Sequence, residues 1–236
     1  INWNDWGYAG WTNDSCTAFP ALTCLAASWN PLLAAKYGYA IGEEARYREK
    51  DVLLGPGVNI YRTPLNGRNF EYMGEDPYLA SELCVPYIQG VQKNGVAACV
   101  KHYALNNQEL WRGHIDVQLS DRALYEIYLP AFKAAVERGK AWSIMGAYNK
   151  VRGTHATHHK LLNNDILKGE WNFDGCVITD WGAAHDTYEA AMYGLDIEMG
   201  SYTNGLTSES EFGYDDYYLG KSYLKMVREG SDGSSE

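Results

Sequence analysis

The sequence is short of basic residues and has no long apolar run. Its 236 residues include 20 Lys and Arg against 30 Asp and Glu, which gives a formal net charge of −10. This acidic balance argues against a nucleic-acid or anionic-membrane partner, because both attract basic surfaces. No apolar run approaches the roughly 20 residues that span a bilayer. We therefore expect a soluble protein that takes a neutral substrate.

The N-terminus has neither an initiator methionine nor a signal-peptide pattern. The chain begins at Ile1 and continues Asn-Trp-Asn-Asp. A secretory signal would show a basic segment followed by an apolar one. We expect the chain to start inside a longer protein, and the compartment is left open.

Several motifs that would indicate cofactor chemistry are missing. There is no Gly-rich phosphate loop, no dinucleotide fingerprint and no serine in a nucleophile elbow, so hydride and phosphoryl transfer are disfavoured. The five cysteines are odd in number and have no tight spacing, so neither a zinc site nor a disulfide framework follows from them. We expect no cofactor.

One run of histidines is similar to a metal-binding cluster. His155, His158 and His159 stand close together in the sequence. No acidic residue stands at a ligand spacing that would complete such a site. We expect a loop of solvated histidines and no metal.

Aromatic residues are abundant, with 19 Tyr and 8 Trp. Their rings offer large flat faces that suit the apolar faces of sugar rings. The alternative is that most of them fill the core and surface. Sugar binding is therefore one interpretation that the composition allows.

Predicted helices and strands alternate along the chain. Helical spacing of apolar residues predicts helices over residues 30–50, 78–93, 120–139, 161–171 and 188–193. Short apolar runs predict strands over 51–60, 96–104, 142–149, around Val177 and Ile178, and over 195–199. This alternation is typical of an α/β fold with a parallel sheet or barrel. Because five strands are fewer than eight, we expect an incomplete (β/α)8 TIM-like barrel over residues 1–229, truncated at both ends, with a linker or disordered tail at 230–236.

Polar and ionisable side chains follow the ends of the predicted strands. Arg68 follows the first strand, Lys101 and His102 the second, Tyr148 the third, Asp180 and Trp181 the fourth, and Glu198 the fifth. In a barrel these ends meet on one face, where catalytic groups converge. A carboxylate among hydrogen-bond donors suits a polyhydroxylated substrate and an oxocarbenium-like transition state. Asp180 is then the candidate nucleophile, and a second carboxyl must serve as acid/base.

Other interpretations of these residues stay open. Asp180 could cap a helix that begins near His185 or Asp186. Lys101 could be a Schiff-base lysine. The whole chain could also be a non-catalytic carbohydrate-binding domain.

Four motifs stand in order along the chain. Residues 55–60 read Gly-Pro-Gly-Val-Asn-Ile, followed by Gly-Arg-Asn-Phe-Glu-Tyr at 67–72 and Gly-Glu-Asp-Pro at 74–77. Then come Lys-His-Tyr at 101–103 with Asn-Asn-Gln-Glu at 106–109, Met-Gly-Ala-Tyr-Asn-Lys at 145–150, and Val-Ile-Thr-Asp-Trp-Gly at 177–182. With these motifs the chain resembles the β-glucosidases of glycoside hydrolase family 3 over nearly its whole length.

The resemblance implies a retaining, exo-acting β-glucosidase, or a β-xylosidase of the same family. It makes Asp180 the nucleophile that forms a glycosyl-enzyme. It places Arg68, Lys101, His102 and Tyr148 around the terminal sugar, and Met145 and Trp181 beside it. The implied partner is a β-glucoside, with glucose as the product.

Two departures from the family pattern concern the missing parts of the site. The family's sugar-binding Asp-Gly-Pro motif is poorly matched by Asp5 with Trp6 and Gly7, so we expect that motif upstream of Ile1. The acid/base glutamate of the family usually comes from a second, α/β sandwich domain. We expect such a domain or chain to supply it, and not Glu71, Glu75, Glu109 or Glu198. Glu71 and Glu75 are expected to support the Arg68 loop, and Glu109 to pair with Arg112.

Overall fold

Four parallel strands form the centre of the computed structural model, which describes residues 16–200 and 217–230. They are β1 (Val52–Leu53), β2 (Ala97–Tyr103), β4 (Ser143–Gly146) and β7 (Cys176–Thr179), in the order β1-β2-β4-β7. Ile144 is paired with Val100 on one side and with Val177 on the other. All three side chains are fully buried, as expected for a parallel sheet that is covered on both faces.

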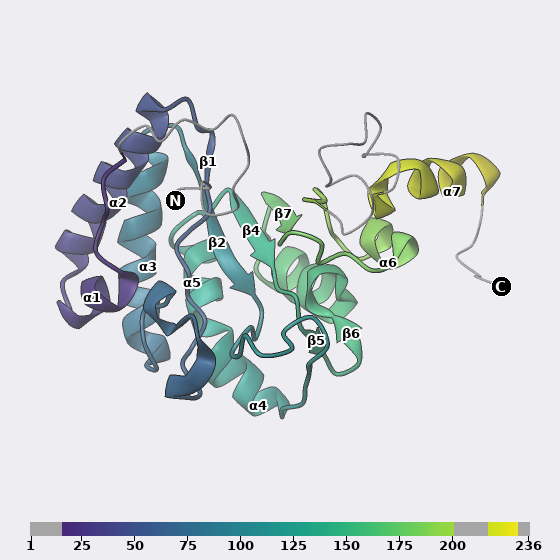
Figure 1. The fold of residues 1–236 in the computed structure, drawn as a ribbon, viewed down its shortest axis with the longest axis horizontal. Coiled ribbons are helices and arrows are strands. Elements are labelled where there is room, and N and C mark those ends of the chain that lie inside the picture. The colour runs from purple at the N-terminus through teal and green to yellow at the C-terminus, as the bar shows by residue number, and fades with distance from the viewer. Residues whose placement is uncertain (1–15, 201–216, 231–236) are drawn as a thin grey trace.

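Helices alternate with these strands and pack around the sheet (Figure 1). The main ones are α2 (Pro31–Tyr47), α3 (Pro77–Gln92), α5 (Pro130–Glu137) and the π-helical segment η6 (Leu161–Glu170). Asn30 starts α2 by accepting the main-chain N–H groups of Leu32 and Leu33, and Asp76 starts α3 in the same way. A proline at the first helical position follows each of these two caps. The helices predicted over 30–50 and 78–93 are thus confirmed.

Shorter elements complete the described chain. They are α1 (Leu22–Ala27), η2 (Pro64–Asn66), η3 (Asn69–Glu71), β3 (Asp116–Val117), α4 (Asp121–Ala123), η4 (Leu124–Tyr128), β5 (Lys150–Val151), β6 (Thr154–His155), η5 (Ala156–His158), α6 (Thr187–Met192), η9 (Tyr218–Ser222) and α7 (Tyr223–Glu229). β3, β5 and β6 form a small separate sheet. Among the described residues, no helix has both the length and the apolar character needed to cross a membrane.

Two of the predicted strands are reduced to two residues or to a single bridge. The strand predicted over 51–60 ends at Leu53, and only a single bridge from Gly57 to Lys101 continues it. Pro56 lies between them after a cis peptide bond, and proline has no N–H to donate to a neighbouring strand. The strand predicted over 195–199 is reduced to one bridge between Ile197 and Ile178.

Strand–helix alternation with one parallel sheet is what part of a (β/α)8 barrel requires. The expected division into a barrel portion at 1–229 and a tail at 230–236 stays a prediction. Gly230 ends α7 with a φ of 65°, and residues 231–236 lie outside the described residues. The poorly matched Asp5 motif also lies outside them.

Candidate active site

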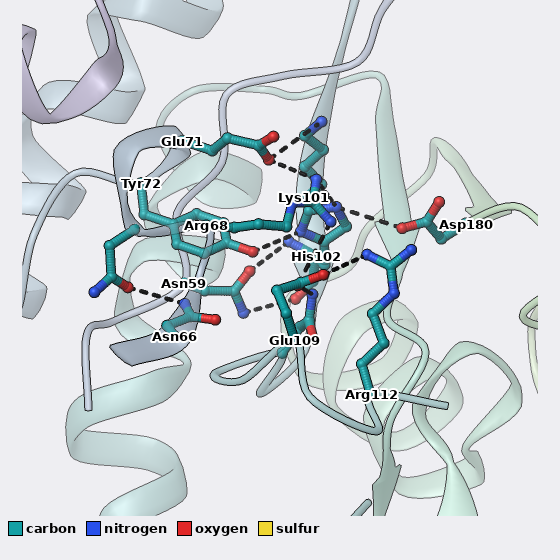
Figure 2. A network of polar contacts seen from close by, with 12 residues as sticks. Asn59, Asn66, Arg68, Glu71, Tyr72, Lys101, His102, Glu109, Arg112 and Asp180 are labelled. Carbon is teal, nitrogen blue, oxygen red and sulfur yellow. Dashed lines mark hydrogen bonds and ion pairs between the residues drawn. The ribbon is translucent and has the colours of Figure 1, made fainter. Parts of the chain in front are cut away.

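The residues predicted from the strand ends meet at the carboxyl edge of the sheet. Figure 2 shows Arg68, Lys101, His102 and Asp180 in one polar network. His102 Nε2 lies 3.4 Å from Asp180 Oδ2 and 3.4 Å from Arg68 Nη2. Three segments far apart in the sequence therefore bring their functional groups to one point.

His102 is held at its backbone and at both ring nitrogens. The Asn59 side chain accepts the N–H of His102 at 2.7 Å and donates to its carbonyl at 2.9 Å. Nδ1 lies 3.0 Å from the Tyr72 hydroxyl. Burial, followed by the positive charges of Lys101 and Arg68, lowers the pKa of His102 well below its usual value. The ring is therefore neutral and carries one N–H.

Arg68 is bound between two carboxylates. Its Nη2 donates to Glu71 Oε2 at 2.6 Å, and its Nη1 lies 3.7 Å from Glu109 Oε1. Burial lowers the pKa of Arg68, but the charge of Glu71 and the other acidic neighbours outweighs burial, so the net shift is upward. The guanidinium stays charged and fixed, which confirms that Glu71 supports the Arg68 loop.

Lys101 shares Glu71 with Arg68. Its Nζ lies 4.0 Å from Glu71 Oε2, and its side chain is only 12% exposed. Burial lowers the pKa of Lys101, while Glu71 raises it in part. Glu71 therefore orients both cations that follow β1 and β2.

Tyr148 lies beside a residue that the strand-end pattern did not include. The Arg112 guanidinium carbon is 4.2 Å from the centroid of the Tyr148 ring, a cation–π contact. Arg112 Nη1 also donates to Glu109 Oε2 at 2.6 Å, so the expected pairing of Glu109 with Arg112 is confirmed. The pair was predicted from the sequence, but its position beside Tyr148 was not, because that contact depends on how the loop after β2 folds back.

Asp180 follows β7 directly. Its Oδ1 accepts the main-chain N–H of Trp181 at 2.8 Å, and its own N–H donates to the Gly146 carbonyl at 3.3 Å. The alternative interpretation, that it caps the next helix, is wrong, because Asp186 caps α6 by accepting the N–H of Glu189. The carboxylate thus remains in the polar network.

Met145 and Trp181 lie in a small apolar cluster next to this network. Met145 is buried with Cys99 and Ile178, and Trp181 packs against that group in a partly buried position. The structure thus brings all seven predicted site residues to the same edge of the sheet, while their roles stay predictions. Glu198 is the exception among the strand-end residues, because its Oε2 accepts the N–H of Leu219 in η9 at 2.7 Å.

The histidine run is not a loop of solvated side chains, so that expectation is wrong. His158 is 1% exposed and His159 9% exposed. His158 is buried because its ring lies between the main-chain N–H of His185 and the carboxylate of Glu189. Among residues 16–200 and 217–230, no three His, Cys, Asp or Glu side chains are arranged to hold a metal ion.

Comparisons with known proteins agree with the fold and the motifs. Residues 5–199 match the profile of the glycosyl hydrolase family 3 N-terminal domain. The chain is 46% identical over 193 residues to thermostable β-glucosidase B of Acetivibrio thermocellus, covering 82% of this chain and 25% of that protein. It is 48% identical over 189 residues to an exo-α-(1→6)-L-arabinopyranosidase of Bifidobacterium longum, covering 80% of this chain and 25% of that protein.

A solved structure of a relative has the same fold. β-Glucosidase 3B of Thermotoga neapolitana, in complex with glycerol, superimposes with a TM-score of 0.84 at 40% identity. The match covers 94% of this chain and 31% of that one. The chain spans about a quarter of the length of the curated relatives named above. It belongs to glycosyl hydrolase family 3, and its parallel sheet is part of the TIM-like barrel of that family's N-terminal domain.

Proposed function

We propose that this chain is the barrel portion of a retaining, exo-acting β-glucosidase that removes the terminal non-reducing β-D-glucosyl residue through a covalent glycosyl–Asp180 intermediate. The observation that carries the proposal is the setting of the Asp180 carboxylate. One oxygen is held by the main-chain N–H of Trp181 at 2.8 Å, and the other faces His102 Nε2 at 3.4 Å. Such a carboxylate is oriented for attack at an anomeric carbon.

The surrounding groups suit a sugar ring with several hydroxyls. Arg68 and Lys101 are cationic hydrogen-bond donors, and both form ion pairs with Glu71. Neutral His102 adds a hydrogen-bonding ring between them. Hydrogen bonds to hydroxyls that strengthen as positive charge develops on the ring contribute to catalysis of glycoside hydrolysis.

We further propose that the acid/base carboxyl comes from a second domain or chain, which the family resemblance identifies as an α/β sandwich. A retaining enzyme needs that group roughly 5 to 5.5 Å from the nucleophile. Glu71 and Glu109 are engaged with arginines, and Glu198 contacts η9. The share of the relatives' length that this chain spans leaves room for such a domain.

A second candidate function follows from the relatives. Two of them, from Bifidobacterium longum and Bifidobacterium breve, are exo-α-(1→6)-L-arabinopyranosidases at 48% and 47% identity. Turnover of the p-nitrophenyl β-D-glucoside, β-D-xyloside and α-L-arabinopyranoside by the complete protein separates these specificities. Sugar binding without any turnover would indicate a non-catalytic carbohydrate-binding protein.

Substitution of the proposed nucleophile tests the mechanism. In the complete protein, Asp180→Asn should lower kcat for an aryl β-glucoside by about a thousandfold or more, because no covalent intermediate can form. Asp186→Asn is the matched control, since asparagine caps a helix as well as aspartate does. It should retain turnover. Unchanged turnover in Asp180→Asn would contradict the assignment.

Labelling identifies the residue directly. A 2-deoxy-2-fluoroglucoside with a good leaving group should add one glycosyl unit to the protein, and peptide mapping should place it on Asp180. A label on another carboxylate would identify that residue, and not Asp180, as the nucleophile. Trapping of Lys101 by borohydride with substrate would instead indicate Schiff-base chemistry.

A further inference from the structure

Tyr72 is buried immediately behind the site and does not face the substrate side of it. Its side chain is 0% exposed, and its hydroxyl lies 3.0 Å from His102 Nδ1. The two rings meet edge to face, with centroids 6.0 Å apart at 88°. Figure 2 shows Tyr72 and Asp180 on opposite sides of His102. Tyr72 therefore contacts the nitrogen of His102 that points away from the proposed nucleophile.

We propose that Tyr72 is a positioning residue that sets the tautomer of His102, so that Nε2 carries the proton and presents an N–H to Asp180 and to the sugar. This inference rests on the proposed function, because it assigns a task to a residue that acts through His102. Tyr72 itself touches neither the nucleophile nor the bound sugar in this proposal.

The donors and acceptors around the ring favour this tautomer. A carboxylate only accepts hydrogen bonds, whereas a tyrosine hydroxyl can donate or accept. Burial raises the pKa of Tyr72, so the hydroxyl keeps its proton. If Tyr72 donates to Nδ1, the single proton of the ring is on Nε2 and points toward Asp180 Oδ2. The opposite tautomer would place the Nε2 lone pair against a carboxylate oxygen 3.4 Å away.

Arg68 does not overturn this assignment. Its Nη2 lies 3.4 Å from His102 Nε2, but it donates to Glu71 Oε2 at 2.6 Å. Nη2 carries two N–H groups, and Glu71 uses one of them in the shorter, charge-assisted bond. The other has only the long contact with Nε2, and a protonated Nε2 gives up that contact but gains Asp180 Oδ2 as an acceptor. Because Asn59 also fixes the His102 main chain on both sides, the Tyr72 hydroxyl is the partner that orients the ring at Nδ1.

The kinetic test removes only the hydroxyl. In the complete protein, Tyr72→Phe should lower kcat/KM for an aryl β-glucoside by about 10- to 100-fold, by analogy with partners that orient metal-bound histidines through their second nitrogen. Tyr103→Phe is the matched control. Tyr103 is equally buried in β2, and its hydroxyl donates to the Leu162 carbonyl at 2.8 Å, away from the network. It should lose stability but retain kcat/KM.

A double-mutant cycle separates positioning from packing. In a His102→Gln background, Tyr72→Phe should cost little further activity, because glutamine has no ring whose tautomer Tyr72 could set. An equal loss in both backgrounds would mean that Tyr72 acts through packing, and the proposal would be wrong.

The tautomer can be observed in the wild-type protein. In the complete protein labelled with 15N-histidine, the His102 signals, assigned by their absence in His102→Gln, should show a protonated Nε2 and an unprotonated Nδ1. A proton on Nδ1 would overturn the proposal even if Tyr72→Phe fails to fold. If Asp180→Asn is inactive while Tyr72→Phe behaves as the wild type, only this inference fails. If Asp180→Asn retains turnover, the proposed function fails as well.

Discussion

Glu109 joins two guanidinium groups that would otherwise repel each other beside the site. Its Oε2 accepts from Arg112 at 2.6 Å, and its Oε1 lies 3.7 Å from Arg68. The Asn106 side chain donates to the same Oε1 at 3.3 Å. Arg112 in turn packs over the Tyr148 ring. Two predicted sugar-binding residues, Arg68 and Tyr148, are thus linked through one carboxylate.

Neutralising that carboxylate should therefore weaken substrate binding. We expect Glu109→Gln in the complete protein to lower kcat/KM for an aryl β-glucoside by about 10- to 100-fold, mostly through KM, because a hydrogen bond to a charged group contributes about 1.5–3 kcal/mol. Steady-state kinetics measure this. A loss confined to kcat would instead place Glu109 in the chemical step.

Glu198→Gln is the matched control. Burial raises the pKa of Glu198, a property that also marks general acids. Its contact with Leu219 points it toward η9, so the variant should retain kcat and the alkaline limb of its pH profile, which a general acid sets because it must be protonated to act. Loss of that limb would make Glu198 the acid/base.

At the scale of elements, α2 and α3 lie side by side (Figure 1). At Gly38 and Gly90 they approach too closely for any side chain larger than that of glycine. A Cβ on Gly38 would lie 2.1 Å from the Tyr87 carbonyl oxygen, and one on Gly90 would lie 2.5 Å from that of Ala35. Both obstacles are backbone atoms, so relief requires the helices to separate. Such contact through small residues fixes the position of α3 and hence of β2, which follows it.

Gly38→Ala should therefore destabilise the protein. Alanine favours a helix by about 1 kcal/mol over glycine, but overpacking costs about 1–3 kcal/mol, occasionally more. The clash at 2.1 Å is severe, so we expect a net loss of about 1–3 kcal/mol in the free energy of unfolding. Urea unfolding measures it. Gly113→Ala is the control, because a Cβ there meets nothing within 4 Å, and equal midpoints for the two variants would contradict the close-packing argument.

The helices and strands whose formation depends on neighbouring residues could be predicted from the spacing of apolar residues in the sequence. Apolar spacing identified α2 and α3, which begin in the structure at the Asn30-Pro31 and Asp76-Pro77 caps. The convergence of strand ends placed Asp180 with His102, because parallel strands share one carboxyl edge. Interactions that depend on loop paths were not predictable. Arg112 over Tyr148 and Tyr72 behind His102 are examples, since no local periodicity encodes them.

At the scale of the whole molecule, His158 at the end of η5 connects that segment to the loop after β7 and to α6. Its Nε2 accepts the main-chain N–H of His185 at 3.2 Å, and its Nδ1 lies 2.8 Å from Glu189 Oε2 in α6. A proton on Nε2 would break the bond to His185. Burial, aided by His155 and His185, lowers the pKa of His158 to about 4. The fold thus requires this ring to be neutral.

Stability should accordingly fall as the pH drops through this window. A histidine in the unfolded chain titrates near 6.5, so between about pH 6.5 and 4 the unfolded state binds a proton that the native state does not. The native state loses up to about 3 kcal/mol relative to the unfolded state across that range, since one pKa unit corresponds to about 1.36 kcal/mol. Above pH 6.5 the ring is neutral in both the native and the unfolded state, so it no longer affects stability.

His158→Gln keeps an acceptor for the His185 N–H but cannot titrate, so thermal unfolding should show a shallower loss of Tm between pH 7 and 5. Exposed His114→Gln should retain the wild-type slope, and an unchanged slope in His158→Gln would show that this ring is not the group responsible.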